Sequence, residues 1–290
     1  MHAVEPFAAG TKPRIRLERN AGYRDVSGIV AQQHLHTVCE EARCPNIYEC
    51  WNRRTATLMI LGDTCTRACG FCSVKTGRPT WNDPLEPVRT AQAVKHLRLR
   101  HVVITSVDRD DLKPDFGAGI WAETIRRIRN EVPECTIEVL TPDFQGKREA
   151  LQTVFEAQPD IFSHNVECVE RISRKVRAQA DWQRSLTVLQ ASVRAGLTTK
   201  TGLMVGLGET GAEVVETMQQ IAAIGVEIFT IGQYLQPTKN HLPVQRYVPP
   251  EEFEEWKTAG LALGFKVVEA GPLVRSSYHA DAQARMIFNQ

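Results

Sequence analysis

Residues 57–72 read TLMILGDTCTRACGFC, a short apolar run that continues directly into a loop with three cysteines. Residues 57–61 have the length and the apolar character of a buried strand. Cys65, Cys69 and Cys72 follow this strand in a C-x3-C-x2-C spacing, and we call these three residues the loop triplet. The stretch therefore predicts a strand that carries three thiols on the loop at its carboxyl end.

Apolar runs of the same kind recur along the chain and alternate with amphipathic helical patterns. The expected strands cover residues 57–61, 101–105, 136–140, 161–164, 199–205, 227–231 and 265–268. One helical pattern starts with a capping box formed by Thr210 and Glu213 and closes at Gly225. Strands and helices that alternate in this way predict an α/β fold with a parallel sheet built from right-handed crossovers. About six such units suit a partial or a full barrel of the TIM type.

The two ends of the chain lack this alternation. We expect residues 1–55 to form an N-terminal extension, residues 56–270 to form the barrel, and residues 271–290 to form a C-terminal tail. In barrels of this class the chemistry lies at the carboxyl ends of the strands. The functional side chains should therefore lie there or on the two extensions.

The composition excludes several classes of protein. Of the 290 residues, 42% are apolar and 24% are charged, which is typical of a globular domain. The 35 basic and 34 acidic residues give a net charge of +1, so no overall field attracts nucleic acid or an anionic membrane. No apolar run approaches the roughly 20 residues of a membrane span, and the start of the chain lacks the apolar core of a signal peptide. We therefore expect a cytoplasmic protein with neither nucleic acid nor a membrane as its partner.

The loop triplet is the strongest chemical signal, because grouped thiols in a reducing compartment are more often metal ligands or catalytic groups than disulfides. Three thiolates on one short loop can bind three corners of a cubane iron–sulfur cluster. A fourth protein ligand is missing nearby, which would leave one iron open to a chelating small molecule. A zinc site is the alternative, although zinc loops more often present C-x2-C pairs and close with a fourth Cys or His.

A second group of cysteines lies upstream, in HTVCEEARCPNIYECW. Cys39, Cys44 and Cys50 have a C-x4-C-x5-C spacing, and we call them the amino-terminal triplet. They could be structural core thiols, but the charged residues between them argue against deep burial of the whole segment. A second cluster site is therefore the favoured interpretation. The remaining cysteines, Cys135 and Cys168, are isolated and are expected to be packed thiols.

The loop triplet, with Phe71 directly before its last cysteine, resembles the signature loop of radical S-adenosylmethionine enzymes. This resemblance implies a 4Fe-4S cluster whose open iron binds the amino and carboxylate groups of S-adenosylmethionine. Reduction of that cluster would cleave the cofactor to a 5′-deoxyadenosyl radical. The resemblance also implies a partial (β/α)6 barrel, in agreement with the strand count above.

The two triplets together resemble the lipoyl synthase family in particular. The likeness extends from about residue 33 to residue 280. It includes TSVDRDDL at 105–112, SHNVE at 163–167, VRAQADWQRSL at 176–186, GLMVGLGET at 202–210, QYLQPT at 233–238 and GPLVRSSYHA at 271–280.

This resemblance implies a second 4Fe-4S cluster, the auxiliary cluster, on the amino-terminal triplet, with Ser277 of the RSSY motif as its fourth ligand. The sequence by itself does not select Ser277, because a tail hydroxyl is most simply an ordinary polar group. An alkoxide would be a hard donor on an iron that otherwise lies among soft thiolates. Such a corner could release its iron.

Several loop residues are candidates for contact with S-adenosylmethionine. The turn GLGE at 206–209 ends an expected strand, and its glycines let backbone amides approach a ligand where the following helix start favours an anionic group. By itself this turn is equally consistent with a plain connection between strand and helix. The resemblance implies cofactor contacts from Phe71, Asn165, Glu167, Lys200, Gly206, Gly208 and Glu209.

Two further polar features have open interpretations. The charged run at residues 108–111, DRDD, follows the second expected strand and is either a solvated loop or part of the site. His164 ends the fourth expected strand and is more simply a packed core imidazole than a catalytic base. No Ser-His-Asp or paired-carboxylate arrangement is legible in the sequence.

The function that the resemblance implies is the insertion of two sulfur atoms at carbons 6 and 8 of a protein-bound octanoyl-lysine. These C–H bonds lie beyond the reach of any side-chain base, whose pKa stays within a few units of roughly 4 to 10. A cofactor radical would therefore remove hydrogen, and the auxiliary cluster would be consumed as the sulfur donor. Two insertions would need two molecules of S-adenosylmethionine.

The same resemblance implies a set of partners. These are octanoylated lipoyl carrier domains (2-oxoacid dehydrogenase E2 subunits and the glycine cleavage H protein), a flavodoxin or ferredoxin as reductant, and an iron–sulfur repair carrier. The alternatives are another radical S-adenosylmethionine sulfur transferase, of the biotin synthase or methylthiotransferase type, and a zinc-binding module without catalysis. The C-x4-C-x5-C spacing and the RSSY tail argue against the former, and metal content separates the latter.

Overall fold

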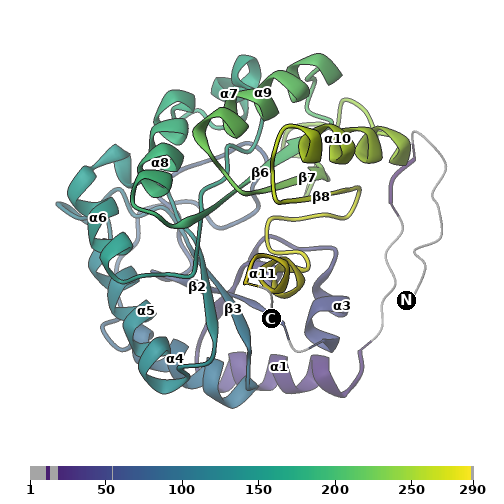
Figure 1. The fold of residues 1–290 in the computed structure, drawn as a ribbon. Coiled ribbons are helices and arrows are strands. Elements are labelled where there is room, and N and C mark those ends of the chain that lie inside the picture. Colours follow the sequence, from purple (N-terminus) through teal and green to yellow (C-terminus); the bar gives the residue numbers. More distant parts are fainter. Residues whose placement is uncertain (1–10, 14–18, 54, 289–290) are drawn as a thin grey trace.

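The computed structural model describes residues 11–13, 19–53 and 55–288. Its centre is one sheet in which each strand pairs with the next along the chain (Figure 1). The strands are β1 (His36–Thr37), β2 (Thr57–Ile60), β3 (His101–Ser106), β4 (Thr136–Leu140), β5 (Ile161–Ser163), β6 (Thr198–Val205), β7 (Ile228–Gln233) and β8 (Val267–Gly271). All pairs from β2 to β8 are parallel, whereas β1 runs antiparallel to β2.

Helices connect the parallel strands on the outside of the curved sheet. They are α4 (Glu86–Leu97), α5 (Ala118–Glu131), the short 3-10 helix η1 (Phe144–Gly146), α6 (Arg148–Glu156), α7 (Glu170–Val176), α8 (Trp182–Arg194), α9 (Gly211–Ile224) and α10 (Pro250–Ala262). Six strands, β2 to β7, are thus each followed by helix before the next strand. This arrangement confirms the prediction of an α/β fold built as a partial (β/α)6 barrel.

Local chemistry explains where α9 begins and ends. The Thr210 hydroxyl accepts the N–H of Glu213, and the Glu213 carboxylate accepts the N–H of Thr210, so the expected capping box is present. Gly225 ends the helix with φ of 97°, a left-handed conformation that favours glycine. The turn GLGE that precedes this helix is thereby fixed at the carboxyl end of β6.

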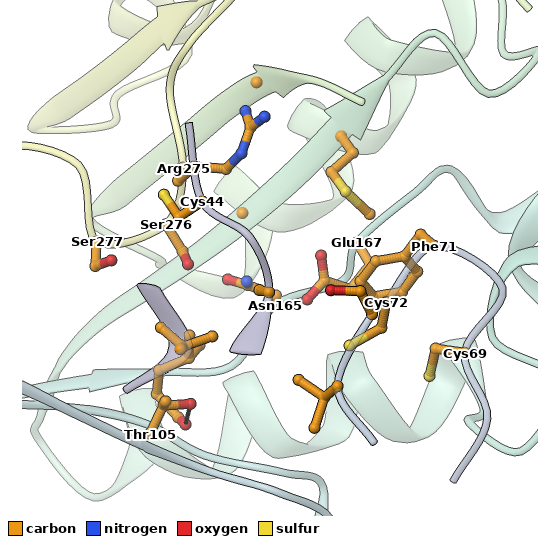
Figure 2. A pocket seen from close by; sticks show the side chains of 18 of the residues that line it. Cys44, Cys69, Phe71, Cys72, Thr105, Asn165, Glu167, Arg275, Ser276 and Ser277 are labelled. Carbon is orange, nitrogen blue, oxygen red and sulfur yellow. Dashed lines mark hydrogen bonds between the residues drawn. The ribbon is translucent and has the colours of Figure 1, made fainter. Parts of the chain in front are cut away.

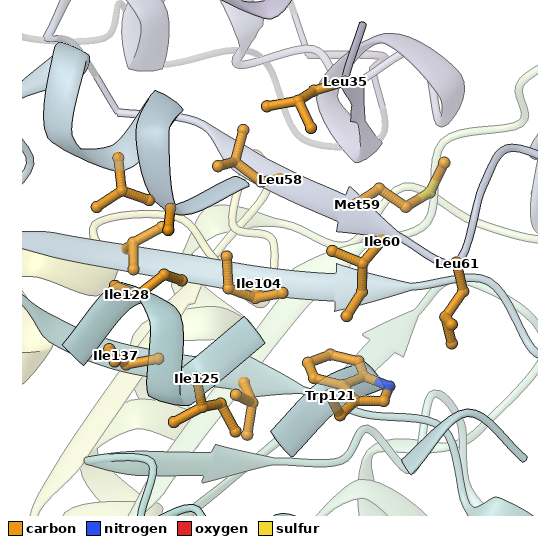
Figure 3. Close-up of a cluster of buried hydrophobic side chains, with 14 of the residues drawn as sticks. Leu35, Leu58, Met59, Ile60, Leu61, Ile104, Trp121, Ile125, Ile128 and Ile137 are labelled. Atoms are coloured by element: carbon orange, nitrogen blue, oxygen red, sulfur yellow. The ribbon is translucent and has the colours of Figure 1, made fainter. Parts of the chain in front are cut away.

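The outer face of the strands builds the main apolar core. Figure 3 shows Leu58 and Ile60 of β2 beside Ile104 of β3, packed against Trp121 and Ile125 of α5. Each of these side chains is at most 1% exposed. Burial of one such side chain contributes about 1.5–3 kcal/mol. Because successive side chains of a strand point to opposite faces of the sheet, the alternate residues of β2 face the barrel interior. Thr57 and Met59 occupy those alternate positions.

Both ends of the chain pack on the barrel. The amino-terminal helices are α1 (Ala21–Gln32), α2 (Val38–Glu41) and α3 (Ile47–Asn52), and the last helix is α11 (Ala280–Phe288). Figure 1 shows α11 at the centre of the ring of strands. Its Ala284 packs with the first residues of three strands, Ile161, Ile228 and Val267, so α11 covers the amino-terminal end of the barrel.

The expected N-terminal extension of residues 1–55 is only partly visible in this architecture, since residues 1–10, 14–18 and 54 lie outside the described residues. The described part is not separate from the barrel, because β1 extends the sheet. No helix in the described ranges is long and apolar enough to cross a membrane.

Candidate active site

The loop triplet lies at the carboxyl end of β2, on the wall of a cavity of about 490 Å³. Cys65, Cys69 and Cys72 all line this cavity. Cys44 and Ser277, from opposite ends of the chain, line it as well. Figure 2 shows Cys69 and Cys72 on one side of the cavity and Cys44 and Ser277 on the other.

The thiols of the loop triplet form no disulfide, and their surroundings oppose ionisation. Burial and the neighbouring Asp108 carboxylate raise the pKa of Cys65 to about 11 and that of Cys69 to about 12. Repulsion among the three thiols adds to both shifts. Thiolates at these positions therefore require a positively charged group between them, which is what the iron atoms of a cluster supply.

A group of ion pairs is centred on Arg67, which lies between Cys65 and Cys69 in the loop. Arg67 is 4% exposed, and its guanidinium donates to Asp110 at 2.8 and 2.9 Å and to Asp143 at 2.6 Å. Asp108 lies 3.3 Å from the same guanidinium and lines the cavity. Burial raises the pKa of Asp108 to about 6, although Arg67 opposes the shift.

The DRDD run at 108–111 is thus not a freely solvated loop. Asp108 and Asp110 face Arg67, and Arg109 is itself buried and bonded to both oxygens of Asp111 at 2.8 and 2.9 Å. His164, as expected, is a packed imidazole, with its ring nitrogens 2.9 Å from the Thr141 carbonyl and 3.1 Å from the Ser185 hydroxyl. The isolated Cys135 and Cys168 are buried, as expected.

The amino-terminal triplet forms a second group of thiols. Cys39, Cys44 and Cys50 line a smaller cavity of about 40 Å³, and Ser277 lies on its wall. Burial raises the pKa of Cys39 to about 12, and Cys44 raises it further. Burial also raises the pKa of Cys50, with added repulsion from the other two thiols. The three thiols are therefore close enough to repel one another when charged.

Contacts between the two ends of the chain bring Ser277 to this triplet. The Asn46 side chain donates to the carbonyl of Leu273 at 2.6 Å. The Tyr278 hydroxyl donates to the Glu49 carboxylate at 3.2 Å. The Thr57 hydroxyl of β2 donates to the Ser277 hydroxyl oxygen at 2.8 Å. The tail is thereby fixed against both the amino-terminal helices and the barrel.

The donor sets fit iron–sulfur clusters by their chemistry. Each site offers three unpaired thiols along one cavity wall, and the second adds a hydroxyl oxygen. Cubane clusters bind one thiolate at each iron, so the thiols need to surround a cluster rather than converge on one point. Within the described ranges, no three His, Cys, Asp or Glu side chains are arranged to hold a single metal ion.

Comparisons with known proteins agree with this site. The family model described as Radical SAM superfamily matches residues 59–221. The lipoyl synthase of Rubrobacter xylanophilus is 57% identical over 272 residues, which cover 93% of this chain and 84% of that protein. The lipoyl synthase of Halalkalibacterium halodurans is 54% identical over 93% of this chain and 90% of its own length. The lipoyl synthase of Bacteroides fragilis is 52% identical over 94% of both chains.

The chain belongs to the lipoyl synthase family. Two solved structures are similar to the chain in their fold. Their sequence identity to it is low, so this similarity concerns the fold alone. Streptococcus suis SuiB bound to S-adenosylmethionine aligns with a TM-score of 0.60 at 11% identity, over 79% of this chain and 55% of SuiB. Methylornithine synthase PylB aligns with a TM-score of 0.51 at 12% identity, over 91% of this chain and 82% of PylB.

Three of the cofactor contacts expected for a lipoyl synthase line the large cavity. These are Phe71, Asn165 and Glu167, which Figure 2 shows beside Cys72. Burial raises the pKa of Glu167, while Arg177 and the Asn165 side chain favour its charged form. Within the described structure the buried Asn165 Oδ1 and Arg177 Nε have no hydrogen-bond partner. Both residues line the large cavity, although these two atoms are themselves buried.

Lys200 does not lie where a lipoyl synthase cofactor contact was expected. Its Nζ lies 2.8 Å from Glu138 Oε1, and both side chains are at most 1% exposed. The other Glu138 oxygen lies 3.6 Å from His101 Nε2. Lys200 is absent from the wall of the large cavity, because its side chain is used in this ion pair deeper in the barrel.

The GLGE turn also differs from the expectation. Gly206, Gly208 and Glu209 do not line the large cavity. The Glu209 carboxylate accepts the N–H groups of Gly206 at 2.6 Å and Leu207 at 2.9 Å, so the amides expected to meet a ligand are already bonded. Gly206 has φ of 96°, and a Cβ there would collide with Gln233 and with the carbonyl of Arg246. These glycines therefore serve the turn itself.

Sequence reasoning missed Arg275, which precedes the two serines of the RSSY motif. Arg275 lines both cavities, and its guanidinium donates to the Val274 carbonyl at 2.6 Å. Burial lowers the pKa of Arg275, while Cys44 raises it. It forms no ion pair with a carboxylate in the described part of the chain. The sequence pointed to Arg275 only through its position as the first residue of the RSSY motif.

Proposed function

We propose that the chain is a lipoyl synthase that inserts sulfur at carbons 6 and 8 of an octanoyl group on a carrier-protein lysine. The observation that carries this proposal is that both thiol triplets reach one cavity, which Cys69 and Cys72 border on one side and Cys44 and Ser277 on the other. A cavity shared by two cluster sites suits a reaction in which one site activates an alkyl chain and the other supplies sulfur atoms to that alkyl chain.

We assign the two 4Fe-4S clusters to the two triplets, with Ser277 as the fourth auxiliary ligand. When bound, the clusters and S-adenosylmethionine supply the radical chemistry and the sulfur. The protein supplies orientation and the exclusion of water. Leu140, Leu203 and Met204 on the cavity wall suit an alkyl chain, and the polar groups of Asn165, Glu167 and Arg177 suit the charged end of the cofactor.

The division of the chain follows from these assignments. Residues 1–55 carry the amino-terminal triplet, residues 56–270 form the barrel with the loop triplet, and residues 271–290 carry the RSSY motif. The tail must stay on the barrel for the second cluster to have its fourth ligand. The hydrogen bond from Thr57 to Ser277 is consistent with this requirement.

The partners of this function are proposals of the same kind. The substrate is an octanoylated lipoyl carrier domain, of a 2-oxoacid dehydrogenase E2 subunit or the glycine cleavage H protein. Electrons come from a flavodoxin or ferredoxin, and an iron–sulfur repair carrier rebuilds the consumed cluster. A cytoplasmic location of the reaction is part of the same proposal.

The deciding experiment is mass spectrometry of an octanoyl-lysyl peptide after anaerobic incubation with the reconstituted protein, S-adenosylmethionine and dithionite. We expect a product in which two sulfur atoms replace two hydrogen atoms. The Cys44→Ala variant should form 5′-deoxyadenosine without this product, whereas Cys135→Ala is a matched control that should make it. A sulfur-free peptide with the wild-type protein, or a protein that binds two zinc ions and no iron, would refute the proposal.

A further inference from the structure

Each triplet of thiols contains a backbone hydrogen bond within its own turn. In the amino-terminal triplet, the N–H of Cys44 donates to the carbonyl of Cys39 at 2.9 Å. In the loop triplet, the N–H of Cys72 donates to the carbonyl of Cys69 at 3.1 Å. Each bond closes a turn that carries two of the three thiols of its triplet. What these turns do not set is the position of one triplet relative to the other.

Ser73 makes a direct bond between the two turns. It follows Cys72 in the chain, and its hydroxyl donates to the carbonyl of Glu41 at 2.7 Å. Glu41 is the last residue of α2, inside the turn of the amino-terminal triplet. Its carbonyl is among those that a helix leaves without an intrahelical partner at its end. Within the described structure, no other hydrogen bond joins residues 38–50 to residues 65–77.

The loop triplet is itself anchored to the segment that follows β7. His241 Nε2 lies 3.0 Å from the carbonyl oxygen of Cys72, and a carbonyl only accepts, so the imidazole is the donor. One residue further along, the N–H of Leu242 donates to the carbonyl of Gly70 at 3.0 Å. The barrel thus holds the loop through its backbone, and the Ser73 hydroxyl extends this support to the amino-terminal triplet.

We propose that Ser73 is a positioning residue that fixes the amino-terminal triplet relative to the loop triplet across the large cavity. This inference rests on the proposed function, in which one site activates an alkyl chain and the other supplies sulfur to it. An activated alkyl chain must meet the sulfur before it reacts elsewhere. The relative position of the two sites therefore decides how often an activation ends in sulfur insertion.

The role of Ser73 is one of position, because its hydroxyl is already used. Ser73 lines the large cavity, but its hydroxyl donates to the Glu41 carbonyl in a partly buried setting. Its effect on the reaction therefore passes through the backbone of the two turns. Without this hydroxyl, the Glu41 carbonyl loses its bond to the loop, and the two triplets are free to sample a wider range of separations.

The test compares two substitutions of Ser73 that have nearly the same shape. Ser73→Thr keeps a hydroxyl, whereas Ser73→Val carries a methyl group in its place. For each reconstituted protein, pulsed EPR measures the spin–spin coupling between the two reduced clusters, and one assay with dithionite measures both 5′-deoxyadenosine and the sulfur-containing product. We expect Ser73→Val to broaden the distribution of couplings and to raise the ratio of 5′-deoxyadenosine to product about five-fold, as befits the loss of one hydrogen bond. Ser73→Thr should restore both towards wild type.

The control is Thr258→Val, which removes a hydroxyl that donates to the Glu254 carbonyl within α10, and it should match wild type in both measurements. Equal couplings and equal ratios in Ser73→Thr and Ser73→Val would overturn the inference. A raised ratio with an unchanged coupling would overturn it as well, because the effect would then not come from the position of the triplets. Should Ser73→Val not fold, Ser73→Ala removes the hydroxyl without added volume.

The EPR coupling separates this inference from the proposed function. A wild-type protein that makes no sulfur-containing product, but whose coupling broadens in Ser73→Val and recovers in Ser73→Thr, would refute the proposed function alone. A wild-type protein with product and with the same coupling in every Ser73 variant would refute the inference alone. A protein that holds a single cluster would refute both.

Discussion

The buried ion pair of Lys200 and Glu138 allows a direct test of what Lys200 does. We consider Lys200→Met, which keeps most of the length of the side chain and removes its charge. Burial raises the pKa of Glu138, but Lys200 and His101 more than compensate and hold that pKa below its usual value. Without Lys200, the Glu138 carboxylate stays buried, and His101, at 3.6 Å, is its remaining ion-pair partner among the described residues. Loss of one partner of a buried pair costs about 3–5 kcal/mol.

The expected effect is on stability and not on the cofactor. For a chain of this size, such a loss lowers the Tm by on the order of 10 °C. The loss should grow as pH rises, because the pKa of Glu138 in the variant lies above its unfolded value and the folded state then binds more protons. Lys200→Met/Glu138→Leu should recover most of the Tm, since apolar residues often replace a buried ion pair without loss.

Thermal unfolding of the reconstituted protein under anaerobic conditions measures the Tm, and equilibrium dialysis measures the Kd for S-adenosylmethionine. We expect a large fall in Tm and an unchanged Kd for Lys200→Met. A Tm within about 2 °C of wild type together with weaker binding of S-adenosylmethionine would refute the structural role. That result would restore Lys200 as a cofactor contact.

Three further predictions follow from the site. Cys44→Ala and Cys69→Ala should each lower the iron content from about eight to about four atoms per chain, and only the Cys69 variant should lose 5′-deoxyadenosine formation; equal loss in both would contradict the assignment. Thr57→Val removes the hydroxyl that donates to the proposed serine ligand, so a chelator should extract iron from the auxiliary cluster about five-fold faster than in wild type. Thr90→Val is the control, because the buried Thr90 hydroxyl has no partner among the described residues, and its rate of iron extraction should match wild type. Burial holds the pKa of His164 at about 4, below its unfolded value, so stability should fall as pH drops from about 6.5 towards 4. In His164→Asn, the loss of stability between pH 6.5 and 5 should be about 2 kcal/mol smaller than in wild type. A plot of Tm against pH that runs parallel to that of wild type would contradict the assignment of this loss to His164.

The sequence predicted the barrel well because its signals are local. Strand and helix periods depend on neighbours within a few residues, and β4 begins and ends at the expected residues. The two-residue β1 has no period to detect and exists only through its pairing with Leu58 and Met59. Phe265 was expected in the last strand, but it precedes β8 and stacks on Phe229 in the core. Its aromatic side chain gave the same signal in either position.

The site was predictable only where its residues share one loop. The thiols of the loop triplet lie within eight residues of each other, so their spacing alone indicated a cluster. The contact between Thr57 and Ser277 spans 220 residues, and no local pattern encodes it. Lys200 shows a different limit. It lies two residues before Gly202 on the same face of β6, yet only Gly202 reaches the large cavity, because depth within a barrel is not visible in one strand.

The layers of the barrel interior explain why the two ends of the chain matter. The thiols of the loop triplet lie at the carboxyl end of β2, the Lys200–Glu138 pair lies deeper, and Ala284 of α11 packs against the first residues of three strands. The tail therefore runs from the proposed serine ligand directly into the helix that covers the barrel floor. Since α11 buries Ala284 there and Asn46 holds the Leu273 carbonyl, Ser277 is anchored on both sides. A hydroxyl so held needs little reordering to bind or to release an iron, which is the property that the proposed consumption and rebuilding of the cluster would require of its fourth ligand.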